Sequence, residues 1–122
     1  MKNSQIFIFA CLLISMISCN KGTNPNLDEK ILYISIKNSE TYIYQTGIGG
    51  DEEQASIINQ AAHFEISRIF RNADTNWEAV YKYKSKPGYK GRDYVEIELG
   101  TGSDGAGPST NVERIKIKFL IL

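Results

Sequence analysis

The sequence predicts an all-β fold, an antiparallel β-sandwich of about seven short strands. Apolar and polar residues alternate with a period of two through several segments, which is the pattern of strands with one buried face. Clusters of Gly, Pro, Asn, Asp and Ser separate these segments at fairly regular intervals. No segment of the folded part sustains the 3.6-residue period of an amphipathic helix.

The alternating segments define the expected strands. They cover residues 31–37, 41–46, 63–70, 77–84, 94–99 and 112–122. We expect the first two to form a hairpin, because only a short turn cluster separates them. The third needs a bulge near Arg68, where the alternation breaks. Residues 52–62 fit either a short helix or an irregular crossover, and the sequence leaves both alternatives open.

The same alternation predicts which side chains face the core. We expect Val80 to lie on the opposite face from its apolar neighbours. The inward residues of the last three strands are Ala79, Tyr81, Tyr83, Val95, Ile97, Leu99, Ile115, Ile117, Phe119 and Ile121.

Residues 86–94 form a Pro-Gly corner between two of these strands. Pro87 presets φ for the first inner position of a turn, and Gly88 and Gly91 can adopt positive φ. The corner therefore turns the chain from one edge or layer of the sandwich to the next.

The N-terminus has the features of a secretory leader that ends at a cysteine. Lys2 supplies a positive start, and residues 6–17 form an apolar run too short to span a bilayer, which takes about 20 residues. Ser18 places a small residue directly before Cys19, and Met16 stands two positions further back. This pattern resembles the bacterial lipobox. The alternative is an ordinary secretory signal whose cleavage site happens to lie near Cys19.

The lipobox resemblance implies that Cys19 becomes the first residue of the mature protein and carries a diacylglycerol thioether and an N-acyl chain, typically palmitate. Several acyl chains anchor a protein stably where one would be marginal. We therefore expect a signal peptide at 1–18, the lipidated Cys19 and a polar tether at 19–30, and a β-sandwich domain at 31–122. The expected location is the bacterial cell envelope, in the outer membrane because Asn20 is not an aspartate.

Charge and residue content narrow the function. Lys plus Arg and Asp plus Glu number 14 each, and removal of Lys2 with the leader leaves 13 against 14, so nucleic acid is not an expected partner. His63 is the only histidine, and no Ser or Cys motif accompanies it. Cys11 lies in the leader, which leaves Cys19 without a disulfide partner. We expect no enzymatic activity, no metal and no cofactor.

Residues 77–83, the corner at 87–94 and the final strand resemble the C-terminal half of bacterial Ig-like and cadherin-like sandwich modules. The resemblance implies that Tyr89 packs under the corner and that Asp93 hydrogen-bonds turn amides. Such modules act mainly as spacers and adhesion domains. They usually occur in tandem, whereas this chain has one, and the acidic calcium ligands of cadherins are absent here.

Two segments are candidate binding surfaces. Lys84, Lys86, Lys90 and Arg92 occur close to Tyr89, and basic residues with aromatics can bind anionic polysaccharides. The alternative is a solvated strand whose lysines prevent edge-to-edge pairing. The glycine-rich loop at 100–111 is the second candidate. It contains G-x-G-x-x-G, but an alternating strand follows it where a nucleotide site needs a helix.

The sequence thus predicts a non-enzymatic, lipid-anchored envelope protein that presents an Ig-like sandwich for binding a protein or glycan partner. The alternative is a structural accessory lipoprotein of a larger envelope complex. Its oligomeric state stays open.

Overall fold

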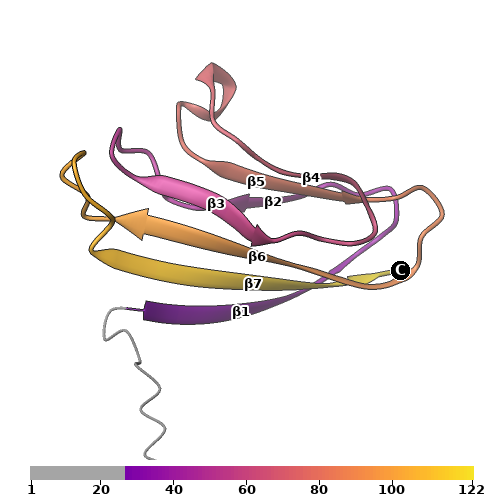
Figure 1. Ribbon diagram of the computed structural model, residues 1–122. Coiled ribbons are helices and arrows are strands. Elements are labelled where there is room, and N and C mark those ends of the chain that lie inside the picture. Colours follow the sequence, from indigo (N-terminus) through magenta and orange to yellow (C-terminus); the bar gives the residue numbers. More distant parts are fainter. Residues whose placement is uncertain (1–26) are drawn as a thin grey trace, which may run out of the picture.

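The computed structural model describes residues 27–122, which form two packed β-sheets (Figure 1). Cys19 and the predicted signal peptide lie outside these residues. The seven strands are β1 Leu27–Ile36, β2 Tyr42–Gln45, β3 Gln54–Asn59, β4 Phe64–Phe70, β5 Val80–Ser85, β6 Gly91–Thr101 and β7 Asn111–Ile121, with a 3-10 turn, η1, at Ala73–Thr75. Within the described range, no helix is long and apolar enough to cross a membrane.

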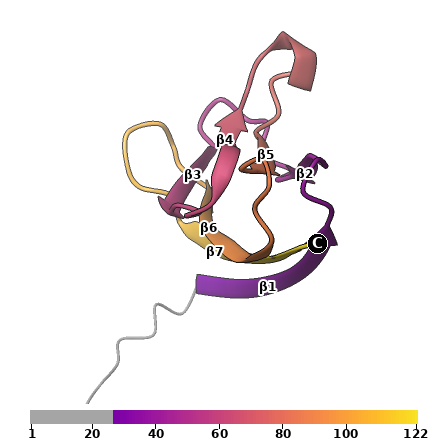
Figure 2. The same ribbon diagram turned by 90° about the vertical axis from the view of Figure 1, so that its right-hand side faces the viewer.

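The strand order is that of an Ig-like sandwich, which confirms the predicted fold class. One sheet has the order β1-β7-β6-β3 and the other β2-β5-β4, and Figure 2 shows the two layers facing each other. Strands β2, β5 and β4 match the B-E-D sheet of Ig domains, and β3, β6 and β7 match the C-F-G sheet. Strand β1 joins the second sheet by a parallel pairing with β7, and all other pairs are antiparallel.

The core lies between the inner faces of the two sheets, and all the residues predicted to face inward are buried. Val95, Ile97 and Ile117 are fully inaccessible to solvent. Tyr83 of β5 stacks on Phe119 of β7, with ring centroids 4.0 Å apart, so aromatic packing joins the layers. Val80 is also buried, although its position in the alternation predicted an outward side chain.

Most of the segment 52–62 forms a strand, β3 at Gln54–Asn59, where a short helix or an irregular crossover was expected. Strand β3 pairs with β6, and Ile57 lies opposite the buried Ile97. Strand β6 extends beyond the predicted 94–99, to Thr101. On the side away from β7, its backbone N–H and C=O groups need hydrogen-bond partners, which β3 supplies. Pairing satisfies those groups and outweighs the weak helical pattern.

The expected hairpin between the first two strands is wrong, since β1 and β2 belong to different sheets. Asn38, in the connection between them, donates hydrogen bonds to the carbonyls of Lys86 (2.7 Å) and Tyr89 (2.8 Å). These bonds hold the connection against the β5–β6 turn, so the chain crosses between layers. β1 also begins at Leu27, so 27–30 are strand rather than tether, because they pair with the start of β7.

Two other boundaries differ from the prediction. Trp77, Glu78 and Ala79 precede β5, and the β2–β3 segment holds Ala79 through the bond from its amide to the Ile48 carbonyl (2.7 Å). The register shift in β4 lies between Phe64 and Ile66 instead of at Arg68.

The Pro-Gly corner takes the predicted form, since it carries the chain from β5 in one sheet to β6 in the other. Gly88 and Gly91 have φ values of 80° and 137°. The Tyr89 hydroxyl donates to the Arg92 carbonyl at 2.6 Å, which packs this ring under the corner. Asp93 accepts hydrogen bonds from the amides of Ala62 and His63, as the Ig-like resemblance implied.

Candidate binding surfaces

The five basic and aromatic residues singled out in the sequence do not form one surface. Lys84 lies on the outer face of the three-stranded sheet, where it pairs with Glu65 at 3.4 Å. Lys86 and Lys90 lie in the β5–β6 turn, and between them Tyr89 stacks on His63 at 4.1 Å. Arg92 is exposed on the other sheet. Only the turn residues are brought together.

The outer face of the four-stranded sheet carries large apolar side chains in contact with solvent. They are Ile31, Tyr33, Tyr94 and Leu120. Tyr33, with 75% of its surface accessible, is the most exposed of them. The register aligns Tyr33 of β1, Lys118 of β7 and Tyr94 of β6 in one row across the sheet. We call this outer surface of β1, β7 and β6 the aromatic face.

Cations accompany the two rings of the aromatic face. The Lys118 ammonium lies 5.5 Å from the centre of the Tyr33 ring, and that of Lys116 lies 4.9 Å from the Tyr94 ring. Lys116 also pairs with Glu96 at 2.7 Å, and this hydrogen bond raises the pKa of the Lys116 ammonium. Neither Lys118 nor Arg92 has an ion pair within residues 27–122. The aromatic face therefore presents two uncompensated positive charges.

A shallow hollow of about 350 Å³ lies on this face. Its wall includes Tyr33, Ser35, Arg92, Lys118 and Leu120. Tyr33 and Ser35 belong to the strand predicted at 31–37, but the sequence pattern does not reveal that they lie beside Lys118 and Arg92. Their proximity results from the parallel β1–β7 pairing, which brings the first and last strands together. No local sequence pattern predicts such a pairing.

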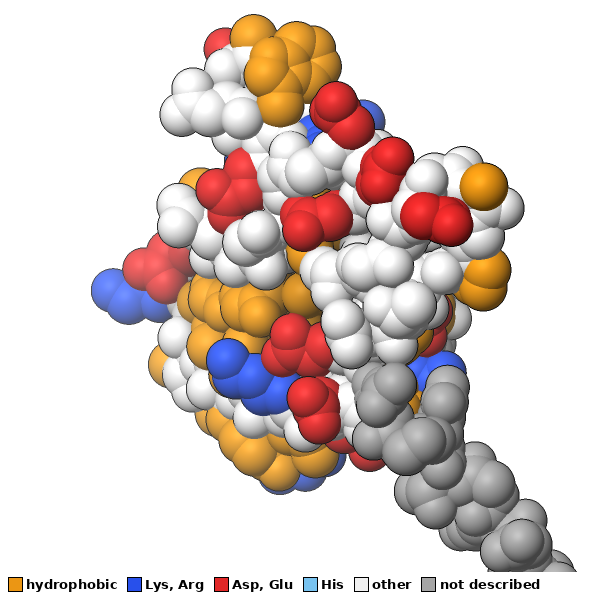
Figure 3. All heavy atoms as spheres, turned by 90° about the vertical axis from the view of Figure 1, so that its left-hand side faces the viewer, with side chains coloured by type: hydrophobic (Ala, Val, Ile, Leu, Met, Phe, Trp, Pro, Cys, Tyr) orange, Lys and Arg blue, Asp and Glu red, His pale blue; other side chains and the backbone are white. Residues whose placement is uncertain are grey.

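The loops at one end of the sandwich are strongly acidic. The β2–β3, β4–β5 and β6–β7 loops meet there, beside the start of β1, and Figure 3 shows many carboxylates on this end. These loops contain one cation, Arg71, and six acids: Asp51, Glu52, Glu53, Asp74, Glu78 and Asp104. We call this the loop end. The opposite connections, 37–41, 60–63 and 86–90, contain Lys37, Lys86 and Lys90 against Glu40.

Arg71 ties two of the acidic loops together. Its guanidinium donates to the carbonyls of Gly50 (2.7 Å), Glu53 (3.2 Å) and Trp77 (2.7 Å). The Glu53 carboxylate accepts from the amides of Gly49 and Gly50, and these bonds lower the pKa of Glu53. Trp77, at the tip, is 62% exposed and has a φ of 59°. The loop end thus presents an exposed indole on loops that the Arg71 hydrogen bonds connect.

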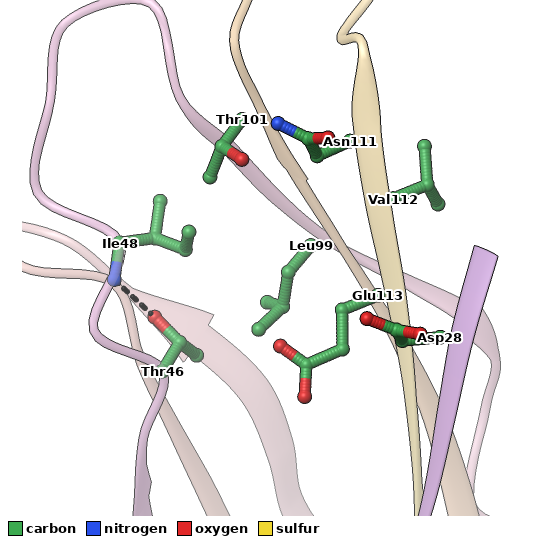
Figure 4. A pocket seen from close by; sticks show the side chains of 8 residues that line it. All are labelled: Asp28, Thr46, Ile48, Leu99, Thr101, Asn111, Val112 and Glu113. Carbon is green, nitrogen blue, oxygen red and sulfur yellow. Dashed lines mark hydrogen bonds between the residues drawn. The ribbon is translucent and has the colours of Figure 1, made fainter. Parts of the chain in front are cut away.

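A pocket of about 340 Å³ opens between the sheets at the loop end (Figure 4). Ile48 and Leu99 form apolar wall, and the carboxylates of Asp28 and Glu113 point to its mouth. Asp28 lies directly opposite Glu113 in the β1–β7 register. Among the described residues, no group of three or more His, Cys, Asp or Glu side chains is arranged to hold a metal ion. The pocket mouth is therefore negative, with the carboxylates of Asp28 and Glu113 side by side.

No protein-family model matches the sequence, and no curated protein matches it at a significant level. A solved structure, a cysteine protease inhibitor from Entamoeba histolytica, is similar with a TM-score of 0.44 and 12% sequence identity, over 80% of this chain and 99% of that one. The strand order of the chain itself, given above, defines its fold as Ig-like.

Proposed function

We propose that this chain is a lipid-anchored, non-enzymatic protein of the bacterial cell envelope, whose Ig-like domain binds a partner through its aromatic face. The observation that carries the proposal is the exposure of Ile31, Tyr33, Tyr94 and Leu120 on one sheet surface. In such a sheet, the outward positions of each strand are ordinarily polar because they contact water. Several large apolar side chains exposed on one sheet face are typical of an interaction site.

The anchor belongs to the same proposal and rests on Ser18-Cys19 at the end of the leader. Cys19 lies eight residues before Leu27, so the chain between them spans at most about 28 Å when fully extended. The domain begins at Leu27, at the loop end (Figure 1). This reach favours an arrangement with the loop end towards the membrane and the β5–β6 turn away from it. The aromatic face would then stand along the membrane normal, accessible to a partner.

A second candidate is the structural accessory role, in which a protein subunit covers the aromatic face permanently. The aliphatic members, Ile31 and Leu120, favour it because interfaces of permanent complexes are more apolar than those of transient ones. Co-purification of a stoichiometric protein in mild detergent would distinguish this role from reversible binding.

The experiment that tests the anchor is intact mass together with detergent partitioning of the full chain expressed in a bacterial host, beside Cys19→Ala. We expect a mature mass that begins at Cys19 and includes several acyl chains, and partitioning into detergent. Both should be lost in the Cys19→Ala variant. A water-phase protein cleaved elsewhere and indifferent to the substitution would refute the anchor.

A further inference from the structure

We propose that the aromatic face binds an acidic polysaccharide, with Tyr33 and Tyr94 stacking on sugar rings and Lys118 and Arg92 contacting the carboxylates or sulfates. This inference deepens the proposed function and rests on its binding role, because it names the chemical class of the partner. The proposed site differs from the basic residues near Tyr89 that the sequence indicated, because three strands, β1, β7 and β6, form it.

The spacing of the two rings suits a chain of sugar rings. Tyr33 and Tyr94 belong to the same row, with β7 between their strands. Two strand spacings separate their backbones by about 10 Å. The face of an aromatic ring carries partial negative charge, which attracts the polarised C–H groups on the flat side of a pyranose. Two exposed rings at this separation can contact different sugars of one extended chain.

Tyr94 is held in place for such a contact. Its hydroxyl accepts a hydrogen bond from the side-chain amide of Asn59 at 3.3 Å, and the Lys116 ammonium lies over its ring. A side chain that is already ordered loses less conformational entropy when a ligand binds. Tyr33, on the edge strand β1, is more exposed and is supported by Lys118 on one side.

The charge of the aromatic face favours an anionic ligand. The row of Tyr33, Lys118 and Tyr94 contains no carboxylate, and neither does the next row, Ser35, Leu120 and Arg92. The row on the other side of Tyr33 is neutralised internally, since Lys116 pairs with Glu96 there. Arg92 offers a planar guanidinium that can bind a carboxylate through two hydrogen bonds. The two open cations border the hollow beside Tyr33, so charge and stacking act at one place.

The density of charge distinguishes a glycan from a nucleic acid. Nucleic acids carry a phosphate on every nucleotide and need a broad basic surface. On the aromatic face, as the structure describes it over residues 27–122, only Lys118 and Arg92 lack an ion pair. Acidic and basic residues balance over the whole sequence at 14 each. A polysaccharide with at most one acidic group per sugar fits two cations and two rings better.

The test uses the full chain carrying Cys19→Ala, so that binding is measured without an acyl chain and its result is independent of the anchor. Polygalacturonate is the anionic probe and dextran the neutral one, in calorimetry or affinity electrophoresis. We expect binding to polygalacturonate that weakens with added salt, and none to dextran. Tyr33→Ala and Lys118→Gln should each lower the affinity at least tenfold without changing the circular dichroism spectrum.

Lys82→Gln and Phe70→Ala provide the matched control, because Lys82 lies 4.8 Å from the Phe70 ring on the opposite sheet and forms a similar cation–aromatic pair. These variants should bind as the parent does. Four outcomes overturn the inference: no binding to polygalacturonate by the folded parent, equal losses in the control variants, loss only in the triple variant Lys84→Glu, Lys86→Glu and Lys90→Glu, or tighter binding to single-stranded DNA or poly-glutamate. If the wild-type chain is acylated but the Cys19→Ala chain does not bind polygalacturonate, the anchor stands and the polysaccharide proposal fails. If the Cys19→Ala chain binds but the wild-type chain is not acylated, the polysaccharide proposal stands and the anchor fails.

Discussion

The buried carboxylate of Asp93 accepts a hydrogen bond from the hydroxyl of Tyr83 at 2.8 Å, and this bond joins the two sheets of the sandwich. Asp93 belongs to β6 and Tyr83 to β5, on either side of the Pro-Gly corner. The same carboxylate accepts from the amides of Ala62 and His63, at 2.9 Å each, in the β3–β4 turn. One side chain of β6 therefore accepts from two segments that are distant in sequence, the β3–β4 turn and β5.

Replacement of Asp93 by Ala should be among the most damaging single changes in the domain. It leaves the amides of Ala62 and His63 without their acceptor, and it leaves the Tyr83 hydroxyl only the His63 carbonyl, 3.3 Å away. Each unsatisfied buried group costs about 1–3 kcal/mol. We expect a loss of about 3 kcal/mol or more in the free energy of unfolding, measured by urea denaturation. Tyr83→Phe removes one donor and leaves the amide bonds intact, so it should cost about 1 kcal/mol. Equal losses in the two variants would contradict the assigned role of Asp93.

The core tyrosines predict a loss of stability at alkaline pH. Burial raises the pKa of Tyr83, with a further contribution from its hydrogen bond to Asp93, and burial likewise raises the pKa of Tyr81. The folded protein therefore keeps both phenols protonated where the unfolded chain releases their protons, near pH 10. The stabilisation is complete below that pH and is lost as the pH rises towards the folded pKa.

Urea midpoints measured from about pH 8 to pH 11 should fall above pH 10, the unfolded value that sets this window. The fall should be shallower in Tyr83→Phe, which has no phenol to ionise at that position. Tyr33→Phe is the control, since Tyr33 is largely exposed, and its profile should match the parent. A profile in Tyr83→Phe as steep as that of the parent would assign the alkaline transition to other groups.

Gly91 is a position where the corner admits no side chain at low cost. Its φ is 137°, and a Cβ atom there would lie 3.0 Å from the hydroxyl of Tyr89. We expect Gly91→Val to lower the unfolding free energy by about 2 kcal/mol or more, from backbone strain and displacement of that ring. Gly49→Ala is the matched control, because Gly49 has an ordinary φ and open space around it. Its unfolding should be nearly unchanged.

The sequence predicted the parts of the fold that local pattern encodes. Alternation in β6 and β7 identified the core residues, and Pro87 with its two glycines identified the corner. Pairing partners were not predictable in this way. The hairpin expected for β1 and β2 was wrong because Asn38, a residue in an ordinary turn cluster, bonds to a loop about fifty positions later in the chain. Strand β3 was missed because its partner, and not its own composition, makes it a strand.

The candidate surface shows the same limit. Tyr33 and Lys118 each looked like an ordinary outward residue of a strand, and only the β1–β7 register brings them together. The lysines and the arginine at 84–92 formed a more obvious cluster in the sequence. The corner, however, carries the chain from one sheet to the other, so that Lys84 and Arg92 lie on opposite sheets. Proximity in sequence is a poor guide to surface patches in a sandwich, because successive strands exchange layers.

Arg71 should control the order of the loop end. It connects the carbonyls of Gly50, Glu53 and Trp77, and Lys cannot reproduce the fork of donors that reaches all three. We expect Arg71→Lys to speed amide hydrogen exchange in the β2–β3 and β4–β5 loops, measured by mass spectrometry, with little change in the strands. Arg68→Lys, in the same strand region but stacked on Phe70 and outside these loops, should leave the exchange unchanged.

The loop end also contains the probe for the proposed membrane orientation, because Trp77 is the only tryptophan of the chain and is exposed there. If the anchor at Cys19 draws this end towards the bilayer, a quencher attached to lipid headgroups should reduce Trp77 fluorescence in the acylated protein on vesicles. A second protein with Trp77→Phe and Lys90→Trp carries the probe in the β5–β6 turn, at the opposite end. Its fluorescence should be quenched less, since β6 alone, with 11 residues, extends about 36 Å between the two ends. Equal quenching of both probes would mean that the domain tumbles on its tether, and stronger quenching at Lys90→Trp would reverse the orientation.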